Sequence, residues 1–238
     1  MQEFHPFSLM HAMVLAAIAG IAVILCLVRR VEGVVQRRLD RGFAVVLLLV
    51  AIFCHGSRLL TEPFDGVRSL PLHLCHLSSW LAPVAIATSW WPARTLLYFW
   101  GLILGSQALI TPVLEEGPAQ LEFWRFWVGH GAIAAASVYD LAARGFRPGL
   151  RAASFAIVAS LVYVAAVLPI NLYSGANYGF VGPSLPARPS ILDWLGPWPL
   201  RLLWVGLLAT VVIVLAAAPW AAAEKRHSRS GADPAAGG

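Results

Sequence analysis

The sequence has few charged residues. Only 12% of its 238 residues are Asp, Glu, Lys or Arg, whereas soluble domains carry roughly 25%. Apolar residues make up 59%, and they are spread along the whole chain rather than confined to one end. A soluble domain of this composition would expose large apolar patches and aggregate. The composition therefore argues against a soluble protein and predicts one all-α bundle of membrane-spanning helices.

Several motifs of known chemistry are absent. The chain has no glycine-rich Walker loop and no GxSxG elbow, so nucleotide hydrolysis and α/β-hydrolase chemistry lack support. Its three cysteines are Cys26, Cys54 and Cys75, and their odd number and irregular spacing argue against a disulfide framework. Lysine is nearly absent, since 16 of the 17 basic residues are Arg. These arginines form no basic stripe with interleaved aromatics, so no nucleic-acid partner is expected.

The start of the chain lacks the features of a cleavable signal peptide. Residues 1–5 contain no Lys or Arg and include Glu3, whereas a signal peptide begins with a positively charged segment. The first positive cluster instead follows the first apolar run. This order predicts an uncleaved first helix with its N-terminus outside.

Seven apolar stretches are long enough to cross a bilayer, which takes about 20 residues in a helix. They cover residues 8–28, 43–60, 70–90, 93–111, 122–143, 149–173 and 200–220. The third stretch is the least apolar, because histidines, serines and Cys75 dilute its first half. Together these stretches predict a single transmembrane helical domain over residues 1–222. The segment 223–238 is small, polar and glycine-rich, and this composition predicts a disordered cytoplasmic tail.

The basic residues are distributed unequally between the predicted connections. If the N-terminus lies outside, twelve of them fall on the cytoplasmic side: Arg29, Arg30, Arg37, Arg38, Arg41, Arg94, Arg144, Arg147, Arg151, Lys225, Arg226 and Arg229. The other side keeps four, Arg68, Arg125, Arg188 and Arg201, with Arg58 near the end of the second helix. Cytoplasmic loops carry an excess of Lys and Arg. The distribution predicts a cell-membrane protein with its N-terminus outside and its C-terminus in the cytoplasm.

Polar residues inside the predicted helices gather towards the outer side. They are His55, Arg58, His73, Cys75, His76, Gln107, Thr111, Arg125, His130 and Asn171. The cytoplasmic halves of the same helices are almost entirely apolar. Because polar groups are costly inside a membrane, their positions indicate function. This outer layer is therefore the predicted location of a site.

The densest polar group is the sequence His73-Leu74-Cys75-His76. On a helix Cys75 shares a face with Ser79, whereas His73 and His76 form an i, i+3 pair on another side. A thiol becomes a nucleophile when a nearby base favours the thiolate, and His130, at a similar depth, is a candidate base. Alternatively, Cys75 is a small apolar filler and His130 hydrogen-bonds to another helix. Both interpretations remain open on the sequence alone.

Other polar and small residues have simpler interpretations. Glu122 and Arg125 are spaced to form a local i, i+3 ion pair, and Gly101 and Gly105 form a small-xxx-small helix-packing pair. A metal site would draw on the same histidines and Cys75. No HxxxH or CxxC pair strengthens that idea and no carboxylate lies at the same depth, so neither a metal nor another cofactor is expected.

The longest outer connection covers residues 171–199 and is rich in Gly, Pro and aromatic residues. It contains few charges, so we expect it to pack over the mouth of the bundle. Its tryptophans, including Trp194 and Trp198, fit an aromatic belt at the membrane interface. A lid over a site is the alternative interpretation.

Five sequence blocks carry a resemblance to a known family. They are LPLHLCHLSSWLAPVA, YFWGLILGSQALITP, FWRFWVGHG, NYGF and SILDWLGPWP, and they occur in this order over most of the chain. The blocks resemble the bacterial YwaF-like membrane proteins, which are similar to the eukaryotic transmembrane protein 164. That relative is a phospholipid acyltransferase acting through a Cys of a Cys-His pair and a His elsewhere. It is also similar in fold to androgen-induced membrane hydrolases that use a Thr nucleophile and a His.

The resemblance implies a membrane-embedded phospholipid acyltransferase or transacylase. Cys75 of the Cys75-His76 pair matches the nucleophile, and His130 of the GHG block matches the second catalytic position. The partners would be a phospholipid or lysophospholipid, and water as acceptor would make the protein a lipase. By residue type, we expect substrate-binding roles for a further set of outer-layer residues: His55, Arg58, His73, His76, Gln107 and Asn177.

The alternative class is a non-enzymatic membrane protein, either a small-solute transporter or a metal-binding bundle. A transporter typically has polar groups near the bilayer midplane and often shows internal repeats. The outer-layer position of the polar groups and the lack of a visible repeat favour the enzyme.

Overall fold

The computed structural model describes residues 3–27, 33–61, 70–184 and 191–230. Over these residues the chain is helical and contains no strand, as predicted. The long helices are α1 (Leu9–Leu27), α2 (Gly33–Thr61), α3 (Leu74–Thr88), α6 (Leu121–Ala142), α7 (Leu150–Ser174) and α8 (Leu200–Ser230). Shorter elements are α4 (Trp91–Leu96), the π-helix η2 (Leu97–Leu104), α5 (Ser106–Ile110) and the 3₁₀ turns η3 (Tyr178–Phe180) and η4 (Ile191–Leu195).

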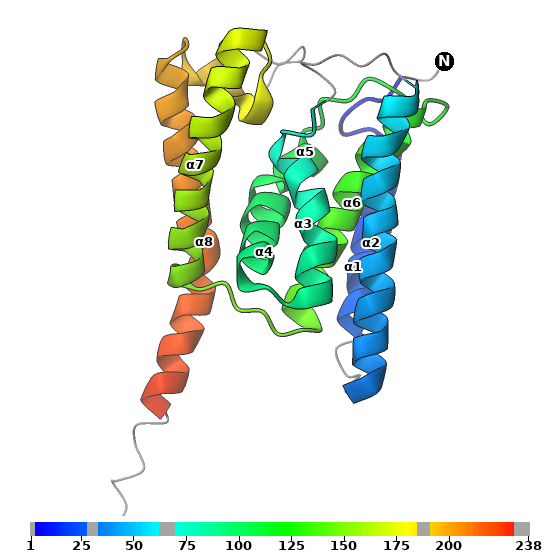
Figure 1. Cartoon of the computed structure of the whole chain (residues 1–238), viewed down its shortest axis with the longest axis vertical. Coiled ribbons are helices and arrows are strands. Elements are labelled where there is room, and N and C mark those ends of the chain that lie inside the picture. Colours follow the sequence, from blue (N-terminus) through cyan, green and yellow to red (C-terminus); the bar gives the residue numbers. More distant parts are fainter. Residues whose placement is uncertain (1–2, 28–32, 62–69, 185–190, 231–238) are drawn as a thin grey trace, which may run out of the picture.

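The helices lie side by side along one direction (Figure 1). The α1–α2 pair forms one side, the α7–α8 pair forms the other, and α3, α4, α5 and α6 lie between them. Helix α6 is the central element, because it contacts α1, α2, α3, α5 and η2. The C-terminal end of α2 and the start of α1 lie at the same end of the molecule, whereas α8 ends at the opposite end.

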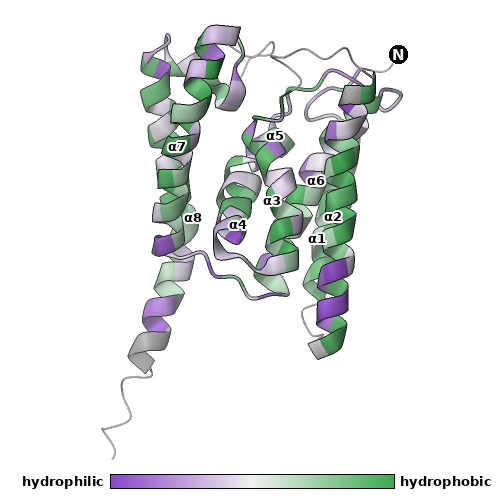
Figure 2. Ribbon diagram, in the orientation of Figure 1, coloured by the Kyte–Doolittle hydropathy of each residue, from purple (hydrophilic) through white to green (hydrophobic). Residues whose placement is uncertain are grey.

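Five helices are long and apolar enough to cross a membrane: Leu9–Leu27, Gly33–Arg58, Trp91–Ile110, Leu150–Ser174 and Leu200–Arg226. Apolar residues follow the shafts of these helices, and the hydrophilic positions concentrate at the lower ends of α2 and α8 (Figure 2). Of the other two predicted spans, the α3 span contains a helix of only 15 residues. Helix α6 has 22 residues but carries Glu122, Arg125, His130 and Asp140, which lower its hydropathy.

Two helices extend beyond the boundaries expected from hydropathy. Helix α2 begins at Gly33, ten residues before the predicted span, so that Arg37, Arg38 and Arg41 lie on helix rather than in a loop. Helix α8 continues to Ser230, so residues 223–230 of the predicted tail are helical in the structure. Ala, Glu, Lys and Arg are all strong helix formers. A segment rich in them can therefore continue a helix beyond the end of its apolar run. The rest of the predicted tail, residues 231–238, lies outside the described residues.

The fourth predicted span consists of three segments in the structure, α4, η2 and α5. Its middle segment is an eight-residue π-helix, whose residues 97–101 are all buried. The hydroxyl of Ser137 on α6 lies 2.9 Å from the carbonyl oxygen of Ile133 in its own helix and 3.2 Å from that of Leu97 at the start of η2. Long π-helices are rare.

Gly101 lets η2 approach α3 and α6 closely, as the small-residue pattern predicted. A Cβ at this position would lie 2.6 Å from Cγ2 of Ile133 and 3.4 Å from Cβ of Ser78. Ile133 and Ser78 are both buried, so neither can move into open space. Gly105 differs, because a Cβ there would collide with the carbonyl oxygen of Gly101 within its own segment.

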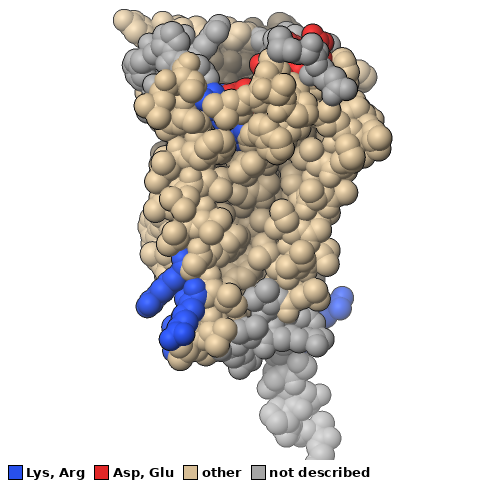
Figure 3. All heavy atoms as spheres, turned by 90° about the vertical axis from the view of Figure 1, so that its right-hand side faces the viewer, with Lys and Arg blue, Asp and Glu red and all other residues tan. Residues whose placement is uncertain are grey.

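Charged groups occupy the two ends of the molecule. In the view from the α1–α2 side, Lys and Arg appear mainly at the lower end, acidic residues appear at the upper end, and a wide band between them shows no charge (Figure 3). At the lower end, Asp140 is 2% exposed and pairs with Arg94 at 2.8 Å and with Arg144 at 3.6 Å. Arg144 also lies 3.8 Å from Asp40 of α2. This cluster joins α2, α4 and the end of α6.

We expect Gly101→Ala to destabilise the bundle by about 1–3 kcal/mol, the usual cost of overpacking a filled core. The measurement is the thermal unfolding midpoint of the purified protein in detergent. Gly206→Ala is the matched control, because a Cβ at Gly206 of α8 meets nothing within 4 Å. An unchanged midpoint for Gly101→Ala would show that the η2 contact with α6 is loose.

Candidate active site

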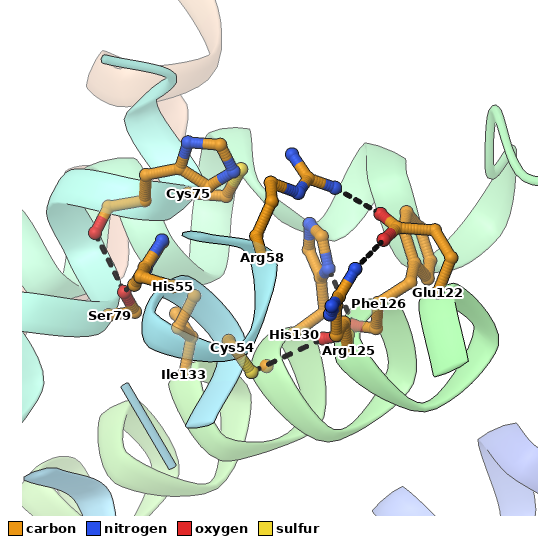
Figure 4. Close-up of a pocket in the computed structure, with 12 residues that line it drawn as sticks. Cys54, His55, Arg58, Cys75, Ser79, Glu122, Arg125, Phe126, His130 and Ile133 are labelled. Carbon is orange, nitrogen blue, oxygen red and sulfur yellow. Dashed lines mark hydrogen bonds and ion pairs between the residues drawn. The ribbon is translucent and has the colours of Figure 1, made fainter. Parts of the chain in front are cut away.

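A cavity of about 80 Å³ lies between the C-terminal end of α2, the first turns of α3 and the N-terminal half of α6. It is lined by Cys54, His55 and Arg58 of α2, by Cys75, His76 and Ser79 of α3, and by Glu122, Arg125, Phe126, Gly129, His130 and Ile133 of α6 (Figure 4). The volume holds a few water molecules or a small polar group rather than a whole lipid. Polar and ionisable side chains dominate the lining, although the surrounding helices are apolar.

Helical spacing explains why these residues meet. On α6, Glu122, Phe126, Gly129 and Ile133 follow one another at three- and four-residue intervals and therefore share one face. On α3, Cys75 and Ser79 are four residues apart and share a face, as the sequence predicted. The structure thus brings the two predicted catalytic residues, Cys75 and His130, to the same cavity.

The backbone orients the imidazole of His130. Its Nδ1 lies 2.8 Å from the carbonyl oxygen of Phe126, one turn earlier in α6. A carbonyl can only accept, so Nδ1 carries the proton and donates it. The other ring nitrogen, Nε2, is then the basic one. The ring of Phe126, with its centroid 4.3 Å from that of His130, packs beside the imidazole.

His55 and Ser79 form a second oriented pair. Nε2 of His55 lies 2.8 Å from the hydroxyl oxygen of Ser79, and this hydroxyl donates to the carbonyl of His76 over 2.7 Å. Since the hydroxyl proton is already used, Nε2 of His55 must be the donor in the first bond. Ser79 therefore orients the imidazole of His55 rather than serving as a nucleophile in this arrangement.

Three histidine rings form a row: His55 of α2, His76 of α3 and His73, which precedes the first residue of α3. The ring centroids of His55 and His76 are 4.9 Å apart, and those of His76 and His73 are 5.4 Å apart. Nδ1 of His76 is buried and has no hydrogen-bond partner among the described residues. His73 does not line the cavity, but it packs against Tyr178 of η3 at 5.1 Å and against Phe180 at 5.9 Å.

An ion cluster of Arg58, Glu122 and Arg125 forms one end of the cavity (Figure 4). Glu122 pairs with Arg58 through Oε1 and with Arg125 through Oε2, the latter at 3.2 Å. The predicted i, i+3 ion pair of α6 is therefore confirmed. Arg125 also donates to the hydroxyls of Ser57, over 2.9 Å, and of Thr61. The cluster joins the C-terminal end of α2 to the N-terminal end of α6.

The two cysteines of the cavity have different surroundings. The thiol of Cys54 donates to the carbonyl of Arg125 over 3.4 Å, and Gly129 leaves room for it, since a Cβ there would lie 3.3 Å from the sulfur. Cys75 is half-buried and free, and it packs against the apolar core of α3 and α6. Cys26 belongs to α1 and does not line the cavity.

The remaining predicted substrate-binding residues lie outside the cavity lining. Gln107 is exposed on α5. Asn177 organises the connection between α7 and α8 instead, because its Oδ1 accepts from the amide of Gly182 at 2.8 Å and its Nδ2 donates to the carbonyl of Ser184 at 2.9 Å. The same connection contains Trp194, which is 90% exposed, as a belt residue would be.

Seven of the twelve lining residues had no predicted catalytic or substrate-binding role, and four of these seven are polar or ionisable: Cys54, Ser79, Glu122 and Arg125. Ser79 and Glu122 could have been found by extending the helical faces of Cys75 and His130 by one and two turns. The described parts of the chain contain no group of three or more His, Cys, Asp or Glu arranged to hold a metal ion.

We expect Arg125→Gln to lower the free energy of unfolding by about 3 kcal/mol, because it removes one partner of a buried ion pair and leaves the others unsatisfied. The side chain of Arg125 is 5% exposed. Thermal midpoints in detergent measure the effect, with Arg38→Gln as the control because Arg38 is exposed on α2. Equal midpoints for the two variants would contradict a structural role for the cluster.

Comparison with known proteins identifies the family of the chain. Residues 4–217 match the TMEM164 family. Neither the curated proteins nor the solved structures contain a match. The five apolar helices agree with the membrane character of this family. The match covers nearly the whole chain, including every residue of the cavity, and the protein is a membrane protein that belongs to the TMEM164 family.

Proposed function

We propose that the protein is a membrane-embedded phospholipid acyltransferase with Cys75 as nucleophile and His130 as general base. The observation that carries the proposal is that a free thiol and an imidazole with a basic Nε2 open into one cavity. Nucleophile and base in one water-accessible site are the minimum for covalent acyl transfer. Membership of the TMEM164 family agrees with the resemblance on which this chemistry rests.

The first half-reaction transfers an acyl chain from a phospholipid to the protein. Nε2 of His130 takes the thiol proton, and the sulfur of Cys75 attacks the ester carbonyl carbon of the lipid. The tetrahedral intermediate then collapses, the carbon–oxygen ester bond breaks, and the proton on His130 passes to the leaving alkoxide. The products are a lysophospholipid and an acyl-thioester on Cys75.

In the second half-reaction the thioester on Cys75 donates the acyl chain to an acceptor. His130 removes the proton from the hydroxyl of an acceptor lysophospholipid, whose oxygen attacks the thioester carbonyl. The carbon–sulfur bond breaks and the thiol is restored with the proton from His130. Water in place of the acceptor would release a fatty acid.

His76 is the proposed donor to the oxyanion. It lines the cavity beside Cys75, and its buried Nδ1 lacks a partner among the described residues. A donor that is unsatisfied before reaction can bind the negative oxygen as it develops. Gln107 and Asn177, two other predicted substrate-binding residues, do not line the cavity.

We also propose that the chain crosses the cell membrane seven times, with the N-terminus outside. Besides the five long apolar helices, α3 and α6 lie alongside them in the bundle. The lower end of the molecule carries Arg37, Arg38, Lys225 and Arg226, which supports a cytoplasmic location. The cavity then lies towards the outer leaflet, at the depth of lipid esters.

The acyl-thioester is the first expected observation. After incubation in liposomes with phospholipid bearing an isotopically labelled acyl chain, wild-type protein should gain one acyl mass, and hydroxylamine should remove it. Cys75→Ala should gain none, because it lacks the sulfur that forms the bond. His130→Gln should form the adduct about 10²- to 10⁴-fold more slowly, the usual contribution of a general base. Intact-protein mass spectrometry measures all three.

Cys26→Ser is the matched control, since Cys26 does not line the cavity and should leave the labelling unchanged. Labelling of Cys75→Ala equal to that of wild type would refute the mechanism. The mechanism would also be refuted if wild type turned over lipid without forming an adduct under rapid quenching and Cys75→Ala turned over lipid at the same rate.

The orientation predicts which end of the protein is reachable from outside the cell. In a background without native cysteines, His5→Cys should react with a membrane-impermeant maleimide in intact cells. Arg226→Cys should react only after lysis. Both positions are exposed, so the membrane alone decides the difference. The reverse pattern would invert the topology, and labelling of both in intact cells would contradict an odd number of crossings.

A further inference from the structure

The two arginines of the ion cluster differ in how they are held. The side chain of Arg125 is 5% exposed and is bound by Glu122, Ser57 and Thr61. The side chain of Arg58 is 28% exposed and reaches from α2 to Glu122 of α6. Glu122 itself is 30% exposed and is shared by both guanidinium groups. The carboxylate of Glu122 therefore pairs with one buried arginine, Arg125, and with one partly exposed arginine, Arg58.

We propose that the Glu122 carboxylate occupies an anion subsite as an internal competitor, and that a phosphate group of the ligand displaces it from Arg58. The identity of the ligand as a phospholipid rests on the proposed function, whereas the displacement can be measured without any reaction. Glu122 thereby becomes a residue that limits affinity for the phosphate.

The chemistry of the groups supports an exchange of this kind. A guanidinium binds carboxylate and phosphate oxygens with the same two-pronged geometry. Partly exposed ion pairs contribute little net stability, so the Arg58–Glu122 contact can open at small cost. After the exchange Glu122 keeps its second oxygen on Arg125, which holds the carboxylate inside the protein. The buried pair thus remains intact while the exposed one changes partner.

The position of the subsite matches a ligand with a phosphate and an acyl ester. On α6, Glu122 precedes His130 by eight residues, which corresponds to a rise of about 12 Å along the helix. On α2, Arg58 lies one turn beyond Cys54 and His55 towards the end of the helix. Cys75 and His130 lie deeper, where Cys75 packs on the apolar core. A phosphate at Arg58 would therefore leave the ester of the same molecule pointing inward.

The proposal predicts opposite effects for the two partners of the exchange. In a neutral maltoside detergent, Glu122→Gln should bind dihexanoyl phosphatidylglycerol about fivefold more tightly than the parent protein, because a competing ion pair of this kind is worth about that factor. Arg58→Gln should bind it at least about tenfold more weakly, since a charge-assisted contact is lost. Titration calorimetry in the Cys75→Ala background measures binding alone, so a failed acyl-adduct experiment leaves this test intact.

Two further probes separate the phosphate from the rest of the ligand. Dihexanoylglycerol has the same acyl chains without phosphate, and its binding should be equal in the parent protein and both variants. If a free phosphate suffices, inorganic phosphate should also bind more tightly to Glu122→Gln and more weakly to Arg58→Gln than to the parent protein. Its affinity should be lower than that of the phospholipid. An effect seen with the phospholipid only would assign the subsite to a lipid headgroup. Either pattern supports the exchange.

Weaker binding of the phospholipid by Glu122→Gln, in parallel with Arg58→Gln, would overturn the proposal, because Glu122 would then only position Arg58. Equal affinities in all three proteins would overturn it as well. Glu122→Asp is the second variant in case Glu122→Gln does not fold. Its shorter carboxylate still pairs with Arg125 on the same helix but reaches Arg58 poorly, so it should also bind the phospholipid more tightly.

Discussion

Polar groups in the interior of an apolar helical bundle must find their partners within the protein, because a bilayer offers none. Helix α6 is where this constraint is most severe. It carries Glu122 and Arg125 near one end and Asp140 near the other, and all three are paired with residues of neighbouring helices. Its central position, in contact with α1, α2 and α3, is what makes those pairings possible. The bundle is therefore organised around a long helix that carries charged residues near both of its ends.

The same constraint shapes the cavity. Two of the three imidazoles that line the cavity satisfy one ring nitrogen locally, and the partner determines the tautomer. His130 uses the carbonyl of Phe126, and His55 uses the hydroxyl of Ser79. Neither partner comes from a ligand, so both rings are oriented before anything binds. Hydrogen bonding that the membrane imposes on the fold thus prepares the groups that the proposed chemistry needs.

Hydropathy and charge predicted much of the fold, because both act along the chain. The apolar helices followed from hydropathy, and the shared cavity of Cys75 and His130 agrees with the similar depth that the sequence predicted for them. The ends of α2 and α8 were missed because helix propensity in polar segments carries no hydropathy signal. Depth also says nothing about rotation around a helix axis. Gln107 was therefore included although it faces outward on α5, and Glu122 was overlooked as a lining residue.

The size of the cavity has a consequence for what the protein can distinguish. At about 80 Å³ it encloses reacting groups but no hydrocarbon tail. Under the proposed chemistry the tails stay among the lipids around α1 and α2, whose outward faces are broadly apolar. The protein would then select an ester by how far it lies below the membrane surface. It would show little selectivity for the length of the acyl chain, because the chain remains in the bilayer.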